Sequence, residues 1–118
     1  MKELLSKAYA PYSHFKVLCV IRKYNGEETY GINTECFSFK DGVCAEQGAL
    51  GSYLSEGSNV KDIKEIEIIS EKENLTPCFL CRCYLNELLD PDTKVICGSK
   101  TYKVKDLCPH PFGKEDLC

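Results

Sequence analysis

The sequence predicts an α/β fold in which a sheet is covered by helices. Two kinds of segment carry this prediction: those rich in β-branched and aromatic residues, and those whose apolar residues recur at helical spacing. They follow one another as strand, strand, helix, strand, helix, strand, which is typical of an α/β layer architecture. The length of 118 residues suits one core, so we expect a single domain over residues 1–118.

The first part of the chain predicts a short helix and a hairpin. One or two helical turns are expected at residues 2–8, and residues 15–24, FKVLCVIRKY, have the composition of a strand. Asn25 and Gly26 follow directly, and this pair favours a type I′ turn, in which both central residues have a positive φ. We therefore expect residues 27–35 to return antiparallel to the first strand.

A helix is predicted from Cys44 to about Ser55, with Gly57 as its C-terminal stop. Two glycines inside this helix, Gly48 and Gly51, each cost about 1 kcal/mol relative to alanine. This cost suggests that another element packs very close to that face of the helix. The residues at helical spacing are Ala45, Ala49, Leu50, Tyr53 and Leu54.

The second half of the chain predicts a central strand, a second helix and two short strands. In residues 63–71, IKEIEIISE, isoleucines alternate imperfectly with acids, as in a strand with one face more buried than the other. Thr76 and Pro77 open a helix from about Cys78 to Leu89, with threonine as the candidate N-cap and proline at the first helical position. The segments KVICG and YKV are short strand candidates.

Composition and charge exclude several classes of function. The net charge is −3 and no basic cluster is present, so no nucleic-acid polymer is expected as a partner. No apolar run approaches the roughly 20 residues that span a bilayer, so no membrane association is expected. The N-terminus lacks the apolar core of a secretory signal, and we therefore expect a cytoplasmic protein.

The nine cysteines suggest a reduced, metal-binding set, because their odd number and the clear strand and helix patterns argue against a disulfide framework. Cys44 begins one predicted helix, and Cys78 and Cys81 form a C-x-x-C pair at the start of the other. Three sulfur ligands with this spacing suit a tetrahedral zinc ion and leave one coordination position open. Helix N-termini stabilise thiolates, so we expect this placement to favour metal binding before the metal arrives.

Glu46 follows Cys44 by two positions and can point beside the open coordination position, where it could carry a proton. An alternative stays open, in which Cys83 or another thiol closes a four-sulfur structural site without chemistry. The two histidines, His14 and His110, are isolated and receive no role. The other cysteines are expected to be small core or surface residues: Cys19, Cys36, Cys97, Cys108 and Cys118.

Four ordered motifs together resemble those of the cytidine deaminases. The sequence C-A-E followed by P-C-x-x-C is similar to the three-cysteine form of the zinc nucleobase deaminase signature. AYAPYSHFKV resembles the opening of the small homotetrameric cytidine deaminases, GINTE their G-x-N-x-E motif, and DLCPHPFGKEDL their ending. The resemblance extends over essentially the whole chain, with some similarity to blasticidin S deaminase.

This resemblance implies a fold, an assembly and a reaction. The expected fold is a three-layer α/β/α arrangement with a mixed five-stranded sheet, and the expected assembly is a homotetramer with one Zn2+ per subunit. The expected reaction is hydrolytic deamination of cytidine and deoxycytidine to uridine and deoxyuridine in pyrimidine salvage. Cys44, Cys78 and Cys81 would bind the zinc, and Glu46 would transfer protons from the attacking water to the ring nitrogen and the leaving ammonia.

The resemblance also implies substrate contacts. Phe15 would line the base pocket, and the backbone of Ala45 would contact the pyrimidine carbonyl. Asn33 and Glu35 would hold the ribose 3′-hydroxyl. Phe112 would reach into the site of a neighbouring subunit, so each site would need the tetramer.

Several positions depart from the family pattern. Gln47 replaces the arginine that follows C-A-E. A hydrogen-bond donor is kept, but a positive charge beside the thiolates is lost. We expect Arg82 to compensate for this lost charge. Phe39 replaces a tyrosine that approaches the ribose 5′-hydroxyl, so one hydrogen bond to the substrate is missing. Phe79 and Cys83 replace a glycine and a glutamine near the second motif, and we expect them to change the pocket shape.

Two alternatives stay open beside cytidine deamination. One is a deaminase of another aminopyrimidine nucleoside, including blasticidin-like compounds, because the departures affect substrate contacts more than the chemistry. The other is a zinc-binding homologue with little activity, for which Gln47, Phe39 and Phe79 are the warning signs. The expected small-molecule partner is a pyrimidine nucleoside, because the sugar motif is kept and the basic surface expected of a tRNA or single-stranded DNA deaminase is missing.

Overall fold

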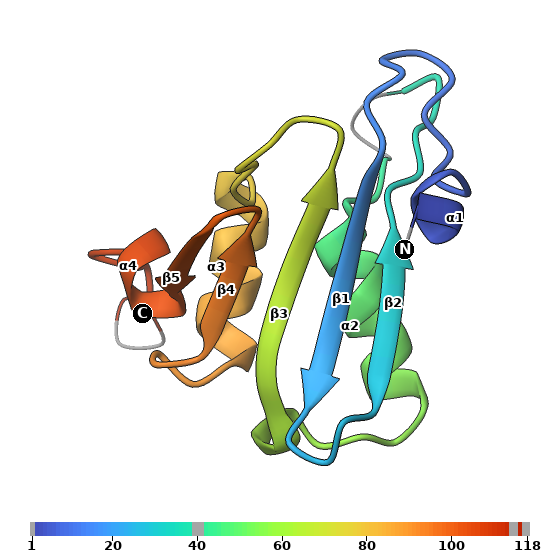
Figure 1. The fold of residues 1–118 in the computed structure, drawn as a ribbon. Coiled ribbons are helices and arrows are strands. Elements are labelled where there is room, and N and C mark those ends of the chain that lie inside the picture. The colour runs from blue at the N-terminus through green and yellow to red at the C-terminus, as the bar shows by residue number, and fades with distance from the viewer. Residues whose placement is uncertain (1, 39–41, 114–115, 117–118) are drawn as a thin grey trace.

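Five strands form one mixed sheet in the computed structural model, which describes residues 2–38, 42–113 and 116 (Figure 1). Their order across the sheet is β2-β1-β3-β4-β5, with β3 in the centre. The predicted α/β fold and mixed five-stranded sheet are thereby confirmed. The strands are β1 (Val17–Lys23), β2 (Glu28–Ile32), β3 (Ile63–Ser70), β4 (Lys94–Cys97) and β5 (Lys100–Lys103).

The two long helices, α2 and α3, cover one face of this sheet and lie behind it in Figure 1. The short α1 packs against β1, and α4 packs against α3 and β5. None of the helices in the described ranges has the length and apolar character that a bilayer span requires. The helices are α1 (Lys2–Leu5), α2 (Ala45–Ser55), the 3-10 helix η2 (Val60–Asp62), α3 (Phe79–Leu88) and α4 (Val104–Leu107).

The strand directions follow from the connections. β1 pairs antiparallel with β2, to which a tight hairpin joins it, and also pairs antiparallel with β3. β3 and β4 are parallel, and β4 and β5 are antiparallel. Parallel neighbours need a crossover, which α3 supplies. The C-x-x-C motif therefore lies in the connection that makes the sheet mixed.

The turn between β1 and β2 differs from the predicted type I′ turn. The Lys23 N–H donates to the Glu27 carbonyl oxygen at 2.9 Å, and the Gly26 N–H donates to the Lys23 carbonyl oxygen at 3.0 Å. Three residues thus lie between the paired strand ends, and Gly26 has φ +93° while Asn25 does not have a positive φ. A three-residue loop that ends on a left-handed glycine shares this sequence signal. The hairpin prediction is confirmed, but its turn type was wrong.

Helix α2 packs directly on β2, and glycines make this close approach possible. A Cβ atom added to Gly31 in β2 would lie 2.1 Å from the backbone nitrogen of Ala49. From the helix side, a Cβ atom at Gly48 would lie 3.3 Å from the carbonyl oxygen of Ile32, whereas Gly51 faces open space. The close packing predicted from the helix glycines therefore applies to Gly48 and not to Gly51.

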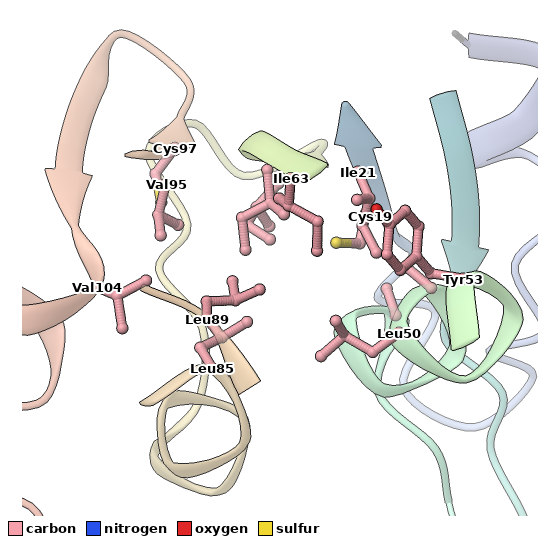
Figure 2. Close-up of a cluster of buried hydrophobic side chains, with 14 of the residues drawn as sticks. Cys19, Ile21, Leu50, Tyr53, Ile63, Leu85, Leu89, Val95, Cys97 and Val104 are labelled. Carbon is pink, nitrogen blue, oxygen red and sulfur yellow. The ribbon is translucent and has the colours of Figure 1, made fainter. Parts of the chain in front are cut away.

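The core lies between the sheet and the two long helices. Figure 2 shows Leu50 and Tyr53 of α2, with Leu85 and Leu89 of the α3 region, pointing toward the buried side chains of the sheet. This packing fixes both helices on one sheet, so their N-termini are held in a constant relation. The sheet contributes Val17, Cys19, Ile21, Ile63, Ile66, Ile68, Val95 and Cys97 to the core.

Two local predictions for the second half of the chain were wrong. Cys78 and not Thr76 is the N-cap of α3, and its sulfur accepts a hydrogen bond from the Cys81 N–H at 3.5 Å. The proline therefore precedes the cap instead of opening the helix. The segment YKV is divided between two elements, because β5 ends at Lys103 and α4 begins at Val104.

Candidate active site

Two helix N-termini meet at the site, and each is capped by a cysteine. Cys44 is the N-cap of α2 and Cys78 is the N-cap of α3. The Sγ atoms of Cys44 and Cys78 lie 3.8 Å apart, and together with the Sγ atom of Cys81 they all lie within 4.8 Å of one another. The structure therefore brings together the three thiols that the sequence predicts as metal ligands.

The positions of these sulfurs fit zinc. A tetrahedral site with Zn–S bonds of about 2.3 Å has its sulfurs about 3.8 Å apart, which is the separation of Cys44 and Cys78. In the described part of the chain no fourth cysteine, histidine or carboxylate joins the cluster. The four-sulfur alternative with Cys83 is not supported, because Cys83 is exposed on α3 and lies outside the cluster.

The surroundings of two of the thiols, Cys44 and Cys81, oppose their ionisation. Burial raises the pKa of the Cys81 thiol, and the nearby Glu46 and Cys44 raise it further. Burial also raises the pKa of the Cys44 thiol, although a hydrogen bond with Cys81 opposes this shift. These shifts act against the stabilisation of thiolates expected at helix N-termini, and that stabilisation stays a prediction. Crowded, desolvated thiols ionise together only when a divalent cation offsets their charge.

Glu46 lies beside the thiols in the first turn of α2. It is 5% exposed, and no other acidic residue in the described ranges is buried. Burial raises the pKa of the Glu46 carboxyl above its ordinary value, while hydrogen bonds with its own backbone N–H and with Cys81 oppose the shift. A buried carboxyl with a raised pKa is suited to taking up and releasing protons, as a general acid and base must do.

A cavity of about 210 Å³ opens at the thiol cluster, with Glu46 in its wall. A second cavity, also of about 210 Å³, adjoins it, and Asn33 and Cys44 line both. The two hollows extend from the sulfurs to Glu35, so a ligand with a ring and a sugar could occupy both. Besides the cysteines and Glu46, the first cavity is lined by Phe15, Val17, Asn33, Ala45, Leu75 and Thr76.

Asn33 fixes the start of β1 beside the first cavity. Its Oδ1 accepts a hydrogen bond from the Val17 N–H at 2.8 Å, and its Nδ2 donates to the Phe15 carbonyl oxygen at 2.8 Å. The amide keeps one further lone pair and one further N–H, so it can also contact a ligand. Asn33 thus holds the backbone that presents the Phe15 side chain, which is 39% exposed, at the cavity.

Glu35 holds the loop that precedes Phe15. Its Oε1 accepts from the backbone N–H groups of Tyr12 at 3.0 Å and Ser13 at 3.1 Å, and its Oε2 accepts from the Ser13 hydroxyl. The hydrogen bond from the Ser13 hydroxyl is the main reason that the pKa of the Glu35 carboxyl lies below its ordinary value. Glu35 therefore presents an ionised carboxylate to the second cavity, which it lines.

The sequence motifs also match a known family. Residues 1–99 fit the family model described as the cytidine and deoxycytidylate deaminase zinc-binding region. The chain belongs to this deaminase family. The cytidine deaminase of Halalkalibacterium halodurans is 34% identical over 116 residues, which cover 93% of this chain and 86% of that protein. The cytidine deaminase of Mycoplasma genitalium is 29% identical over 119 residues, which cover 97% of this chain and 91% of that protein.

A solved structure of the deaminase family has the same fold. The crystal structure of cytidine deaminase from Burkholderia pseudomallei matches with a TM-score of 0.86 and 32% sequence identity, and the match covers 94% of this chain and 92% of that chain. The zinc-binding region of the family is thus present in this deaminase fold, and Cys44, Cys78 and Cys81 are positioned to bind the ion.

Two residues near the cluster, Gln47 and Arg82, form no hydrogen bond with the cysteine sulfurs in the described part of the chain. Gln47 is half-buried on α2 and forms no hydrogen bond with the cysteine sulfurs in the described part of the chain. The donor contact expected of Gln47 is therefore not seen. Arg82 donates its side-chain hydrogen bonds to oxygen atoms, so any compensation for the missing charge acts at a distance and not by contact.

The residues expected to reshape the deaminase pocket lie outside it. Phe79 is 83% exposed, Cys83 is exposed, and neither lines the two cavities beside the thiols. The prediction that they change the pocket shape is not supported. Phe112 is 66% exposed on the segment after α4, which leaves its role at a neighbouring subunit a prediction. Phe39 lies outside the described residues.

Three residues that line the first cavity were not predicted from the sequence. The sequence signal that could have found them is their place at the edges of motifs. Val17 ends AYAPYSHFKV, and Leu75 and Thr76 directly precede the P-C-x-x-C motif. A larger hollow of about 620 Å³ lies between the start of β3 and the end of α3, and it contains none of the predicted site residues. The missed residues that line the first cavity are Val17, Leu75 and Thr76.

Proposed function

We propose that this chain is a zinc-dependent cytidine deaminase that hydrolyses cytidine and deoxycytidine to uridine and deoxyuridine with release of ammonia. The observation that carries the proposal is Glu46, a buried carboxyl in the wall of a cavity that is also lined by Cys44 and Cys78, two of the three clustered thiols. A structural metal site has no need of such a carboxyl. The family match and the relatives named cytidine deaminase support the same activity.

In the proposed reaction Glu46 moves the protons. Cys44, Cys78 and Cys81 would hold the zinc, which when bound supplies a Lewis acid that makes a water molecule easier to ionise. Glu46 takes a proton from this water as its oxygen bonds to C4, and passes it to the neighbouring ring nitrogen. It then carries the second proton of the water to the amino group, and the C4–N bond breaks to release ammonia. The carboxylate is regenerated at the end.

We place the pyrimidine ring in the first cavity and the sugar toward the second. Phe15 would border the base, the Ala45 backbone would contact the pyrimidine carbonyl, and Asn33 and Glu35 would receive the 3′-hydroxyl. The positions of these residues in the cavity walls support this placement. Because backbone groups already hold Asn33 and Glu35, both are oriented before substrate binds.

We also propose that the protein acts as a single domain over residues 1–118 and assembles as a homotetramer with one zinc per subunit. Phe112 supports the assembly because its exposed side chain is available to a neighbouring site.

A role in pyrimidine salvage follows from a nucleoside substrate. A site of three thiols fits the reducing cytoplasm, where we place the protein. Sedimentation of the zinc-loaded protein measures the number of subunits.

The deciding experiment is a substrate screen on zinc-loaded protein, followed by ultraviolet absorbance. Cytidine, deoxycytidine, deoxycytidylate and blasticidin S form the panel, and Glu46→Gln is the control. We expect cytidine and deoxycytidine to be converted by the parent protein. If blasticidin S or the nucleotide is converted faster than cytidine, the nucleoside assignment is wrong. If the parent binds zinc and converts nothing, the chain is a zinc-binding homologue without turnover.

A further inference from the structure

We infer that Arg82 is a positioning residue that ties the lip of the site cavity to the C-terminal segment through the geometry of its hydrogen bonds. Its Nε donates to the Pro77 carbonyl oxygen at 2.8 Å, and one terminal nitrogen, Nη2, donates to the Thr76 hydroxyl at 2.9 Å. The other terminal nitrogen, Nη1, donates to the Leu107 carbonyl oxygen at 3.2 Å. One side chain thus joins two segments that lie 30 residues apart in the sequence. This inference rests on the proposed function, because its kinetic test uses cytidine.

The first segment that Arg82 holds is the lip of the cavity. Thr76 lines the cavity, and Pro77 is the buried residue directly before the predicted zinc ligand Cys78. A guanidinium is planar and its N–H groups have fixed directions, so two bonds to adjacent residues define the orientation of the lip as well as its position. The backbone that leads into Cys78 is therefore set by Arg82, one turn further along α3.

The second segment that Arg82 holds is the end of α4. Leu107 is the last residue of α4 and is buried, and the segment that carries Phe112 continues from this point. The bond to the Leu107 carbonyl oxygen thus sets where the C-terminal segment leaves the core. Through Arg82, the position of that segment is coupled to the position of the cavity lip.

The contacts of Arg82 favour geometry over charge as its main role. All three acceptors are uncharged oxygens, and none is a cysteine sulfur. The exposed ring of Phe79 lies against the guanidinium, with its centroid 4.9 Å from Cζ, and adds a further fixed contact. A lysine at this position would keep the positive charge but could not make the three-way set of bonds, because its ammonium has no planar fork. Arg82→Lys therefore separates the role of the hydrogen-bond geometry from the role of the positive charge.

The chain contains a matched control for this substitution. Its other arginine, Arg22, also donates three side-chain hydrogen bonds, in this case to Glu28, Glu65 and Glu67 on the sheet. None of these residues lines either cavity at the thiols. Arg22→Lys therefore costs a comparable set of contacts at a place away from the site.

The test compares Arg82→Lys, Arg82→Gln and Arg22→Lys in zinc-loaded protein. We expect Arg82→Lys to raise the KM for cytidine about tenfold, with a smaller change in kcat. We also expect about tenfold faster amide hydrogen exchange at residues 81 and 82, whose N–H groups donate to Cys78, and in residues 105–108, as the loss of one or two hydrogen bonds implies. Arg22→Lys should leave the KM and the exchange of both segments unchanged. If Arg82→Lys behaves like the parent while Arg82→Gln is impaired, Arg82 acts by charge and the inference is overturned.

A second variant covers the case in which substitution of Arg82 prevents folding. Thr76→Val removes one acceptor and nearly preserves the side-chain shape, so we expect faster exchange at residues 81 and 82, whose N–H groups donate to Cys78, but not in 105–108. Unchanged exchange at residues 81 and 82 would overturn the inference. If the parent protein does not convert cytidine, the proposed function fails, but the exchange measurements still decide the role of Arg82.

Discussion

The sulfur atoms of Cys44 and Cys78 lie 3.8 Å apart although 34 residues separate them in the sequence. A zinc ion bound between them would cross-link the N-termini of α2 and α3. We therefore expect a chelator to lower the thermal midpoint of the protein by roughly 5 to 10 °C, since ligand binding to the folded state stabilises it and each kcal/mol shifts the midpoint by several degrees. Differential scanning fluorimetry with and without added zinc measures the shift.

The control for this prediction lies on the same helix. Cys78→Ser should lower the zinc content of the purified protein and its thermal midpoint, because it removes one of the three clustered thiols. Cys83→Ser should change neither, because Cys83 is exposed and lies outside the cluster. Equal zinc loss in the two variants would mean that Cys83 takes part in the metal site.

Glu46→Gln should separate binding from chemistry. The amide has nearly the shape of the carboxyl but cannot take up and release a proton, and general acid and base catalysis contributes about 10²- to 10⁴-fold to a rate. We expect kcat for cytidine to fall by at least about 100-fold, while zinc content and the binding of uridine stay close to those of the parent. Stopped or continuous ultraviolet assays measure the first effect, and metal analysis with calorimetry the second. A variant that turned over like the parent would remove Glu46 from the proposed mechanism.

Two glycines should respond to alanine in opposite directions. Gly31→Ala places a Cβ atom 2.1 Å from the backbone of Ala49, and we expect it to lower the free energy of unfolding by about 1 to 3 kcal/mol or more, because helix and strand must move apart. Gly51→Ala has open space and removes a helix-interior glycine, so we expect a gain of about 0.5 to 1 kcal/mol. Urea unfolding of the zinc-loaded variants measures both. A destabilising Gly51→Ala would indicate that another subunit covers this face.

Ser13→Ala should change how the stability of the protein depends on pH. The hydrogen bond from Ser13 lowers the pKa of Glu35 in the folded state, so its stabilisation is present above the unfolded pKa of about 4.3 and is lost as pH falls through the lower folded value. We expect the difference in thermal midpoint between the parent and Ser13→Ala to be full above about pH 5 and to shrink on further acidification. Midpoints measured from pH 7 to pH 3 test this.

A hydroxyl that bonds to an uncharged group is the control for the pH prediction. The Ser55 hydroxyl donates to the Gly51 carbonyl oxygen at 2.7 Å, and neither group titrates. The midpoint difference caused by Ser55→Ala should therefore be the same at every pH in the series. A Ser13→Ala difference that is also constant with pH would show that Ser13 does not act through the ionised Glu35.

The sequence predicted the longer elements because their signals are local and repeated. The helix expected from Cys44 to Ser55 is observed as Ala45–Ser55, and the strand expected at residues 63–71 is observed as Ile63–Ser70. Short elements carry too few residues for a pattern. Val104 was therefore assigned to a strand, although its buried side chain begins the four-residue α4.

At the site, too, features with a local sequence signal were predicted, and features that depend on tertiary structure were not. The motifs identified Cys44, Cys78, Cys81 and Glu46, because ligand spacing is visible along the chain, but the raised pKa of Cys81 depends on burial, which is a property of the tertiary structure. The contacts of Glu35 with Ser13 join residues 22 positions apart and have no local signal.

The parallel pairing of β3 with β4 has a consequence for the order of events during folding. Cys44 leaves the ribosome 34 residues before Cys78, and we expect the crossover that carries the C-x-x-C pair to be fixed only once β4, at Lys94–Cys97, has been made and has paired with β3. We therefore expect high-affinity metal capture to be a late event, which stabilises a folded subunit and does not nucleate its folding. A nascent chain truncated before β4 should retain zinc no better than a short peptide containing the C-x-x-C pair.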